Sequence, residues 1–168
     1  MPAPVTITKL LAMKQKSEKI VALTAYDFPF AKIASICGRY YAMDRDTRWD
    51  RTEKAYNLYT LGEGRLESDP GDAIKKAYTS QETDEFLEPV AIVAENGKPL
   101  ATVNDGDGVI FFNFRPDRAR QITRAFTETN FEGFPRKKTP ELCGYVCMAI
   151  YDENFDLPVA FGPVHLEN

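Results

Sequence analysis

Two groups of arginines follow directly after apolar runs of the chain, and their side chains could do chemistry. The first group follows the run 33–37, and the second follows the run 109–114. Arginine suits phosphate and carboxylate, because its planar fork donates two parallel hydrogen bonds. The predicted function is therefore binding of a small molecule that carries both groups. The candidate substrate-binding residues are Arg39, Arg45, Arg115 and Arg118.

The predicted elements could bring these arginines together. In an α/β sheet the binding crevice lies outside the carboxyl ends of the strands, where each apolar run would deliver its arginines. A helix is expected directly after Arg115, so Arg115 and Arg118 would also meet the anion-binding end of that helix. Asp44 and Asp117 would offset part of the positive charge. An alternative stays open, because the charged residues of 39–51 could instead pair along one helix face.

The composition is that of a globular protein. The chain has 168 residues, 43% of them hydrophobic and 27% charged, which predicts one domain with a real core. Its net charge of −4 argues against nucleic acid as a partner, since nucleic-acid binders carry basic surfaces. No apolar run approaches the roughly 20 residues of a membrane span, and no signal-peptide pattern opens the chain. We therefore expect a cytoplasmic protein without membrane contacts.

Three cysteines are interpreted as reduced core thiols: Cys37, Cys143 and Cys147. Cys143 and Cys147 are four residues apart, which raises the alternative of a metal site. Only one histidine, His165, could join them, so the core interpretation is favoured. We expect no metal site and no cofactor in this chain.

Buried-strand patterns alternate with amphipathic-helix patterns, which predicts a three-layer α/β/α domain with a mixed, mainly parallel sheet. The predicted strands cover residues 19–26, 33–38, 89–95, 100–104, 109–114 and 143–150. Asn96 and Gly97 lie between two apolar runs, which is typical of a two-residue type I′ turn, so one β-hairpin is expected there. Pro99 would keep one strand of that hairpin at a sheet edge.

Apolar spacing and capping residues predict four helices. They cover residues 6–14, 46–61, a stretch from Pro70 onward, and 117–126. The inward-facing residues of the last three are expected to be Trp49, Ala55, Tyr56 and Tyr59, then Ala73, Ile74, Ala77 and Tyr78, and then Ala119, Ile122, Thr123 and Phe126.

Several long motifs resemble one enzyme family, in the same order along the chain. GRYYAMDRDTRWDR begins at Gly38 and is followed by EKAYNLYTLGEG, while DGDGVIFFNFRPDRARQITRAF and YVCMAIYDENFDLPVAF come later. These motifs span roughly residues 32–163 and resemble the substrate (transferase) domain of cofactor-independent phosphoglycerate mutase. The resemblance implies that the matching arginines hold phosphoglycerate. These are the four arginines already chosen: Arg39, Arg45, Arg115 and Arg118.

The resemblance also implies what this chain lacks. That family interconverts 2-phosphoglycerate and 3-phosphoglycerate through a phosphoserine, with manganese ions, and the serine and the metal ligands belong to another domain. The family's proton-handling histidine and aspartates have no counterpart here. We therefore expect a small anionic phosphorylated ligand, no catalytic residue, and no isomerase turnover by this chain alone.

Residues 1–34 resemble a different family. TITKLLAMKQKSEKIVALTAYDFPFAKIA, from Thr6, is similar to the amino terminus of ketopantoate hydroxymethyltransferase, a (β/α)8-barrel enzyme whose metal motif is not matched. A chimera is therefore predicted, with its join near residues 32–34. The expected organisation is a single domain, 1–168, made of a helix–strand segment (1–33), a partial mutase substrate domain (34–163) and a tail (152–168).

Two functions from different classes remain open. The chain could be a binding remnant that holds 3-phosphoglycerate weakly, or an engineered or recombined structural scaffold with no activity. A hydroxymethyltransferase activity is poorly supported, because most of that barrel has no counterpart. Strands lost from the sheet would leave an exposed edge, through which the chain could form a homo-oligomer.

Overall fold

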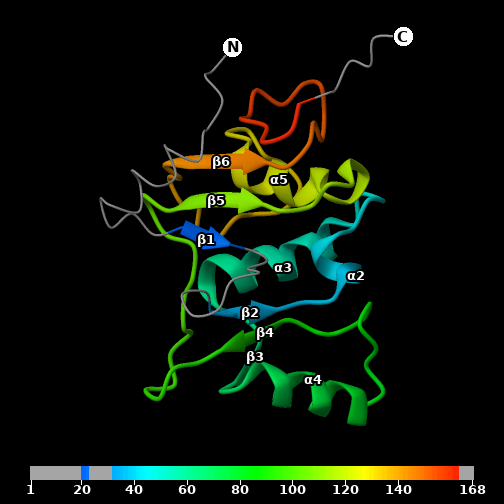
Figure 1. Cartoon of the computed structure of the whole chain (residues 1–168), viewed down its shortest axis with the longest axis vertical. Helices are drawn as coiled ribbons and strands as arrows, with labels where there is room; N and C mark the ends of the chain where they lie inside the picture. The colour runs from blue at the N-terminus through cyan, green and yellow to red at the C-terminus, as the bar shows by residue number, and fades with distance from the viewer. Residues whose placement is uncertain (1–19, 23–31, 163–168) are drawn as a thin grey trace.

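The structure is a computed structural model, and it describes residues 20–22 and 32–162. Within these residues the strands form two three-stranded sheets (Figure 1). The first sheet has the order β1-β5-β6, with β1 at Ile20–Ala22, β5 at Gly108–Phe111 and β6 at Gly144–Cys147. The second has the order β2-β4-β3, with β2 at Ser35–Ile36, β4 at Val90–Ile92 and β3 at Arg65–Glu67.

Three of the four strand pairs in the described sheets are parallel. Ile20 lies opposite Gly108, and Gly108 lies opposite Gly144, in parallel register. Arg65 pairs in parallel with Val90, whereas β2 is antiparallel to β4. The predicted α/β fold with mixed, mainly parallel pairing is therefore confirmed. The strands divide between two sheets rather than forming the single sheet expected, because the chain leaves the second sheet after β4 before β5 pairs with β1 and β6.

The hairpin after β4 differs in kind from the predicted one. The Gly97 N–H donates to the Ala94 carbonyl at 2.9 Å, and the Ala94 N–H donates to the Lys98 carbonyl at 2.9 Å. Gly97 has a φ of 73°, whereas Asn96 has no positive φ. The loop therefore has three residues and ends in a left-handed glycine, instead of the two-residue type I′ geometry.

Two strand predictions need correction. Residues 100–104 form no strand, because beyond the hairpin loop only an isolated bridge joins Val93 to Pro99, and proline has no N–H to extend a ladder. Strand β3 was not expected, since two of its three residues are charged and it is largely exposed. Its Leu66 side chain is 57% exposed.

The described residues form four α-helices and one 3-10 turn: α2 at Arg39–Ala42, α3 at Trp49–Leu61, α4 at Pro70–Thr79, η1 at Pro116–Arg118 and α5 at Arg120–Thr127. Helix α3 ends at Gly62, which has a left-handed φ of 72°. Helix α4 begins at Asp69, whose side chain accepts the Asp72 N–H at 2.9 Å. Helix α2 was not expected, and the helix predicted at 6–14 lies outside the described residues. None of the described helices has the length and apolar character needed to span a membrane.

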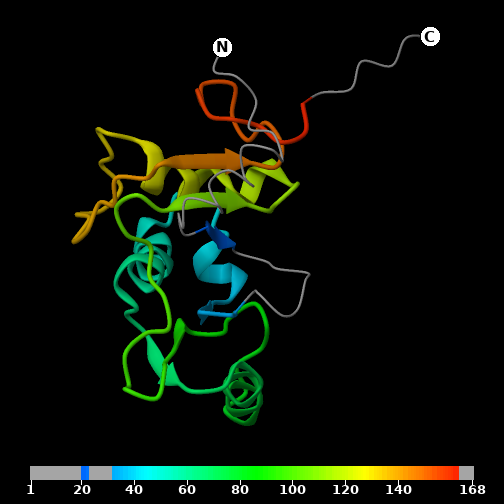
Figure 2. The same ribbon diagram turned by 60° about the vertical axis from the view of Figure 1, so that its left-hand side comes forward.

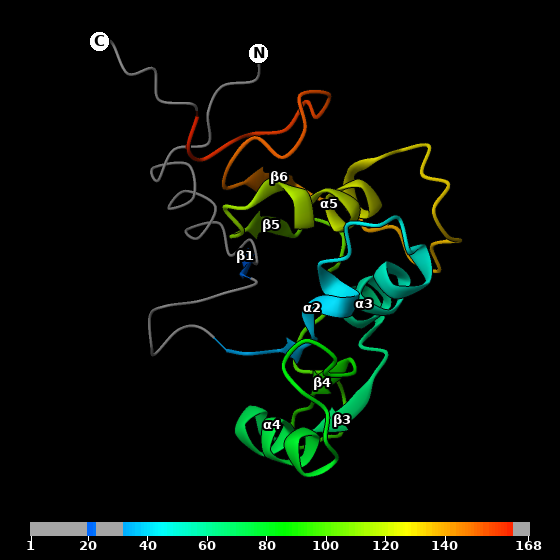
Figure 3. The same cartoon turned by 90° about the vertical axis from the view of Figure 1, so that its right-hand side faces the viewer.

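The helices are distributed over the two sheets (Figures 1 and 2). Helix α5 packs on the first sheet, and α4 lies beside the second sheet, at the opposite end of the molecule. Helix α3 lies at the level between the two sheets. Figure 3 shows that α2 and the beginning of α3 come close to α5, although these segments are far apart in the sequence.

Two apolar clusters stabilise this arrangement. The main cluster consists of Tyr56, Val103, Val109, Phe111, Ala119, Ile122, Ala125, Phe126, Phe134, Tyr145, Cys147 and Tyr151. The smaller one consists of Ala73, Ala77, Leu87, Val90 and Ile92. The predicted inward faces of α3 and α5 are confirmed, because their residues are buried or pack against the main cluster. On α4, Tyr78 is 53% exposed instead of inward-facing, and its hydroxyl donates to Asp84.

The segment 152–162 packs on the protein instead of forming a loose tail. Leu157 packs against the main cluster. The Cys147 N–H donates to the Pro158 carbonyl at 2.9 Å, and the Ala160 N–H donates to the Cys147 carbonyl at 2.8 Å. This segment therefore covers the outer edge of β6.

The three cysteines have different surroundings. Cys147 is buried, Cys37 is half-buried and Cys143 is exposed. The interpretation as a core thiol is therefore confirmed for Cys147 and wrong for Cys143. Burial raises the pKa of the Cys37 and Cys147 thiols to about 12.

Candidate functional site

Arg45 lies in the connection between α2 and α3, residues 43–48, which we call the arginine loop. Its guanidinium donates to Asp117 Oδ2 at 3.0 Å. Asp117 belongs to η1, so this ion pair joins segments that are 72 residues apart. The Arg45 side chain is 46% exposed and is accessible to a ligand.

Arg115 shares the same carboxylate. Its Nε donates to Asp117 Oδ1 at 2.8 Å, so each carboxylate oxygen receives one guanidinium. Burial alone would raise the pKa of Asp117, but the hydrogen bonds and charges of Arg45 and Arg115 outweigh it and lower the pKa. The Arg115 side chain is 70% exposed. The pair of arginines therefore holds one oxyanion and remains open to solvent.

Arg118 connects the same turn to the arginine loop. Its guanidinium donates to the Met43 carbonyl at 3.0 Å, two residues before Arg45. The structure thus brings Arg45, Arg115 and Arg118 together after the end of β5, as the sequence predicts. The expected helix end contributes little, because η1 has three residues and α5 begins only at Arg120. The anion-binding potential of this site rests on its side chains.

Arg39 is held elsewhere. It opens α2, and its guanidinium donates to Glu85 at 2.6 Å. The N–H groups of Gly38 and Tyr40 donate to the carbonyls of Leu87 and Glu85, at 2.8 and 2.9 Å, which fixes the start of α2 on this segment. A Cβ atom at Gly38 would lie 2.4 Å from the Glu85 carbonyl oxygen, so a larger residue would push the two apart. Among the described contacts, Arg39 shares no partner with the other three arginines.

Asp44 lies inside the arginine loop and is only 4% exposed. Its Oδ2 accepts the N–H groups of Asp46 at 3.0 Å and Arg48 at 2.9 Å, and its Oδ1 accepts the Arg51 guanidinium at 3.2 Å. Burial alone would raise the pKa of Asp44, but its hydrogen bonds and the Arg51 charge outweigh it and lower the pKa. Asp44 was expected to offset one of the site arginines. It stabilises the backbone of their loop instead.

Gln121 was not expected among the functional residues. It is buried on α5, and its Nε2 donates to Asp44 Oδ2 at 2.9 Å. Its Oε1 accepts the Thr47 N–H at 3.0 Å. No signal in the sequence singles it out, because Gln121 lies outside the predicted inward stripe of its helix. Once buried, its amide needs polar partners, and the arginine loop supplies them.

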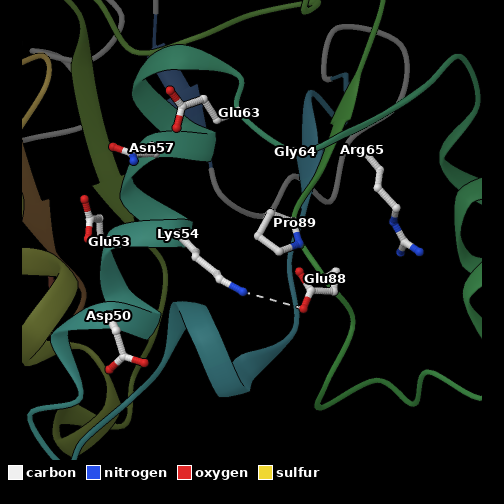
Figure 4. Close-up of a pocket in the computed structure, with 9 residues that line it drawn as sticks. All are labelled: Asp50, Glu53, Lys54, Asn57, Glu63, Gly64, Arg65, Glu88 and Pro89. Atoms are coloured by element: carbon white, nitrogen blue, oxygen red, sulfur yellow. Dashed lines mark ion pairs between the residues drawn. The ribbon is translucent and has the colours of Figure 1, made fainter.

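A separate cleft of about 530 Å³ lies between α3 and the segment before β4 (Figure 4). Its lining residues are Asp50, Glu53, Lys54, Asn57, Glu63, Gly64, Arg65, Glu88 and Pro89. Both signs of charge are present, and Lys54 reaches across to Glu88 at 3.7 Å. None of the four candidate arginines lines this cleft.

In the part of the chain that the structure describes, no group of three or more His, Cys, Asp or Glu side chains could hold a metal ion. His165 lies outside that part.

Residues 8–153 match a family model described as the BPG-independent PGAM N-terminus. Similar proteins include the 2,3-bisphosphoglycerate-independent phosphoglycerate mutase 1 of Methanosarcina barkeri, which is 57% identical over 139 residues. The 2,3-bisphosphoglycerate-independent phosphoglycerate mutase of Desulforudis audaxviator is 52% identical over 139 residues. These alignments cover 82% and 83% of this chain, and 27% of each relative.

A solved structure agrees with this match. A crystal structure of Leishmania mexicana phosphoglycerate mutase at low cobalt concentration has a TM-score of 0.73 and 34% sequence identity. The match covers 79% of this chain and 25% of that one. The chain therefore spans about a quarter of the length of the relatives that it matches.

The family match begins at residue 8, inside the segment that resembles ketopantoate hydroxymethyltransferase. The comparisons give no support to a second parent family, and the chimera stays a prediction. With most of its length matched by the family model, the chain belongs to the family of BPG-independent phosphoglycerate mutase N-terminal domains.

Proposed function

We propose that this chain is a partial substrate-binding domain that holds a small phosphorylated carboxylate, with 3-phosphoglycerate as the ligand. The observation that carries the proposal is that Arg45 and Arg115 converge on one carboxylate, Asp117, beside a third arginine. A phosphate or carboxylate presents the same oxygen geometry to a guanidinium pair. Arg39 would join the ligand only after leaving Glu85.

Binding is expected to be weak. Each charge-assisted hydrogen bond is worth roughly 1.5–3 kcal/mol at best. The arginines are exposed to solvent, and the ligand must compete with Asp117 for them. We expect a dissociation constant no tighter than about 1 mM, or about 4 kcal/mol.

We further propose that this chain alone does not interconvert 2-phosphoglycerate and 3-phosphoglycerate. The proposal is supported by the length of the relatives, of which the match covers about a quarter, and by the family resemblance, which assigns the nucleophile and the manganese ligands to the other domain. A coupled assay with and without manganese should show no activity. Metal-dependent activity that survives stringent purification would overturn this part of the proposal.

The second candidate is a structural scaffold with no activity, and one contact favours it. Asp117 already pairs with Arg45 and Arg115, so the arginines have an internal partner without any ligand. The two candidates differ in one measurable property, which is the affinity for 3-phosphoglycerate.

A fluorescence titration separates the two candidates. Trp49 is the single tryptophan of the chain and directly follows the arginine loop, so its emission should respond when 3-phosphoglycerate binds. Arg115→Ala should weaken binding at least fivefold, about 1 kcal/mol or more. The control is Lys75→Ala, which removes one positive charge from an exposed position on α4. Arg136 is less suitable, because its guanidinium donates to two backbone carbonyls.

The outcomes are distinct. Saturable binding that Arg115→Ala weakens and Lys75→Ala spares supports the binding domain. Equal losses in both variants would mean non-specific charge attraction, which added salt would also screen. The limit expected from exposed contacts is a dissociation constant of about 1 mM. If the Trp49 emission does not change at 3-phosphoglycerate concentrations far above that value, the scaffold is favoured.

Three further expectations stay predictions. A cytoplasmic location, the absence of nucleic-acid and membrane partners, and pairing of two copies through a sheet edge rest on the sequence alone. The proposed origin of residues 1–34 also rests on the sequence alone. Within the described residues, β1 supplies a strand that pairs in parallel with β5, so we propose that this segment completes the first sheet whatever its origin.

A further inference from the structure

The arginine loop is attached to η1 and α5 by contacts from both sides. From η1, Asp117 accepts the Arg45 guanidinium at 3.0 Å and Arg118 donates to the Met43 carbonyl at 3.0 Å. From α5, Gln121 contacts the buried inner side of the same loop. These contacts fix the backbone on both sides of Arg45. The position of its side chain therefore does not depend on the ion pair with Asp117 alone.

The loop has a conformation that needs such support. Thr47 has a φ of 56°, a left-handed value that residues with a β-branched side chain rarely adopt. Its N–H points to the Gln121 Oε1 at 3.0 Å. The Asp44 carboxylate gathers the N–H groups of Asp46 and Arg48 on its Oδ2, which also accepts the Gln121 amide. The loop thus closes around Asp44, and Gln121 joins it to α5.

We propose that Gln121 and Asp44 form a clamp that positions Arg45 for the anionic ligand, and that Gln121 is a positioning residue of this site. The inference rests on the proposed function, and the clamp can be tested without it. Glutamine fits the role because one side chain supplies both a donor for the carboxylate and an acceptor for the Thr47 N–H. Leucine would leave the Thr47 N–H without this acceptor and would remove one of the donors to Asp44, and glutamate would place a second carboxylate against Asp44.

The test compares two variants of the full chain. Gln121→Leu removes the polar atoms at similar volume. Thr123→Val is the matched control, because Thr123 lies on the same helix, is fully buried, and bonds to the Tyr145 hydroxyl at 3.0 Å instead of the arginine loop. Urea unfolding of both variants gives the fraction folded, so that the readouts are compared between native populations.

The first readout is independent of any ligand. Exchange of the Thr47 amide proton, followed by NMR, should become about tenfold faster in Gln121→Leu and stay unchanged in Thr123→Val. If Gln121→Leu does not fold, Gln121→Met is used, because it keeps the unbranched shape of glutamine while removing both the amide acceptor for Thr47 and the donor to Asp44. Unchanged protection of Thr47 in the folded variant would overturn the clamp.

The second readout is a titration with 3-phosphoglycerate, followed through the side-chain Nε–H signal of Arg45. We expect Gln121→Leu to weaken binding about fivefold, while Thr123→Val changes it less than about twofold. Equal weakening in both variants would overturn the positioning role. A third outcome is that the wild-type chain binds no 3-phosphoglycerate while the Thr47 amide proton still exchanges faster in Gln121→Leu. In that case the proposed function fails, and the clamp stands as the set of contacts that holds Arg45 in its loop.

Discussion

Asp117 lies between Arg45 and Arg115 and accepts from both, next to the place where the proposed ligand would present its oxyanion. The pKa of this carboxyl is lowered, because the hydrogen bonds and charges of the two guanidiniums outweigh its burial and favour a negative charge there. The same carboxylate also repels an incoming anion. Asp117 therefore orients the arginines and competes with the ligand at the same time.

Replacing Asp117 by asparagine should strengthen anion binding. Removing one negative charge about 6 Å from the ligand is worth about 1 kcal/mol, or about fivefold in affinity for sulfate or 3-phosphoglycerate. Calorimetry or NMR titration measures the change. Asp72→Asn is the control, because Asp72 is an exposed partner of Lys75 on α4. Weaker binding in Asp117→Asn would mean that orientation outweighs repulsion.

Asp44 should make the stability of the fold depend on pH. Its folded pKa is lowered, so its contribution is complete above the unfolded value of about 3.9 and is lost as the pH falls through the folded value. Asp44→Asn should therefore cost about 3 kcal/mol near pH 7. The difference from the wild type in urea unfolding should shrink below about pH 4. A difference that stays constant down to pH 2.5 would contradict this assignment.

At the residue scale, the sequence predicted the positions of the candidate arginines better than the residues that hold them in place. Arg45, Arg115 and Arg118 lie together as the pattern of apolar runs predicted, but the same pattern placed Arg39 with them, and Arg39 pairs elsewhere. The pairing of Arg39 with Glu85 could not be foreseen, because it depends on where the segment before β4 passes α2. Gln121 was missed because it lies outside the predicted inward stripe of its helix and its partners lie 69–77 residues away in the chain.

At the scale of elements, the turn after β6 is bonded to the end of β5. The Tyr151 hydroxyl donates to the Phe111 carbonyl at 2.7 Å, and the Asn113 carbonyl lies 2.5 Å from it. The same Tyr151 hydroxyl also accepts the Met148 N–H at 3.2 Å. Tyr151 is 1% exposed, so its hydroxyl has no access to water as an alternative partner. This hydroxyl thus fixes the backbone that leads into Arg115.

Removing that hydroxyl should destabilise the protein. Tyr151→Phe leaves buried carbonyls unsatisfied, so the free energy of unfolding should fall by about 1–3 kcal/mol. Tyr78→Phe should change it by less than about 0.5 kcal/mol, because Tyr78 is exposed on α4. Urea unfolding of both variants measures the two changes. Similar values for the two would show that the buried hydroxyl contributes no more than a surface one.

The elements themselves were predicted where local signals are strong. The Asp69 cap and the stop at Gly62 set the limits of α4 and α3, and both can be read from the sequence. The Asn96–Gly97 turn was located correctly, but its type depends on the φ of Asn96, which neighbouring residues do not fix. Strand β3 was missed because its residues are exposed and carry no apolar alternation.

At the scale of the whole molecule, the two apolar clusters differ in size. Helix α4 buries only Ala73 and Ala77, whereas α5 buries five residues. Local opening should therefore cost less around α4 than around α5. We expect amide protons of α4 to exchange faster than those of α5 in native buffer. Equal protection in the two helices would mean that the clusters open together.

The contacts of the arginine loop also determine when it can form during synthesis. Its partners in η1 and α5 lie 72–77 residues further along the chain. At a synthesis rate of 5–20 residues per second, the ribosome needs about 4–15 s to add that length. Throughout this interval the Asp44 carboxylate has no Gln121 to bind, and the nascent loop lacks its contacts with η1 and α5. The site of this domain is therefore completed late, by the part of the chain that leaves the ribosome after β5.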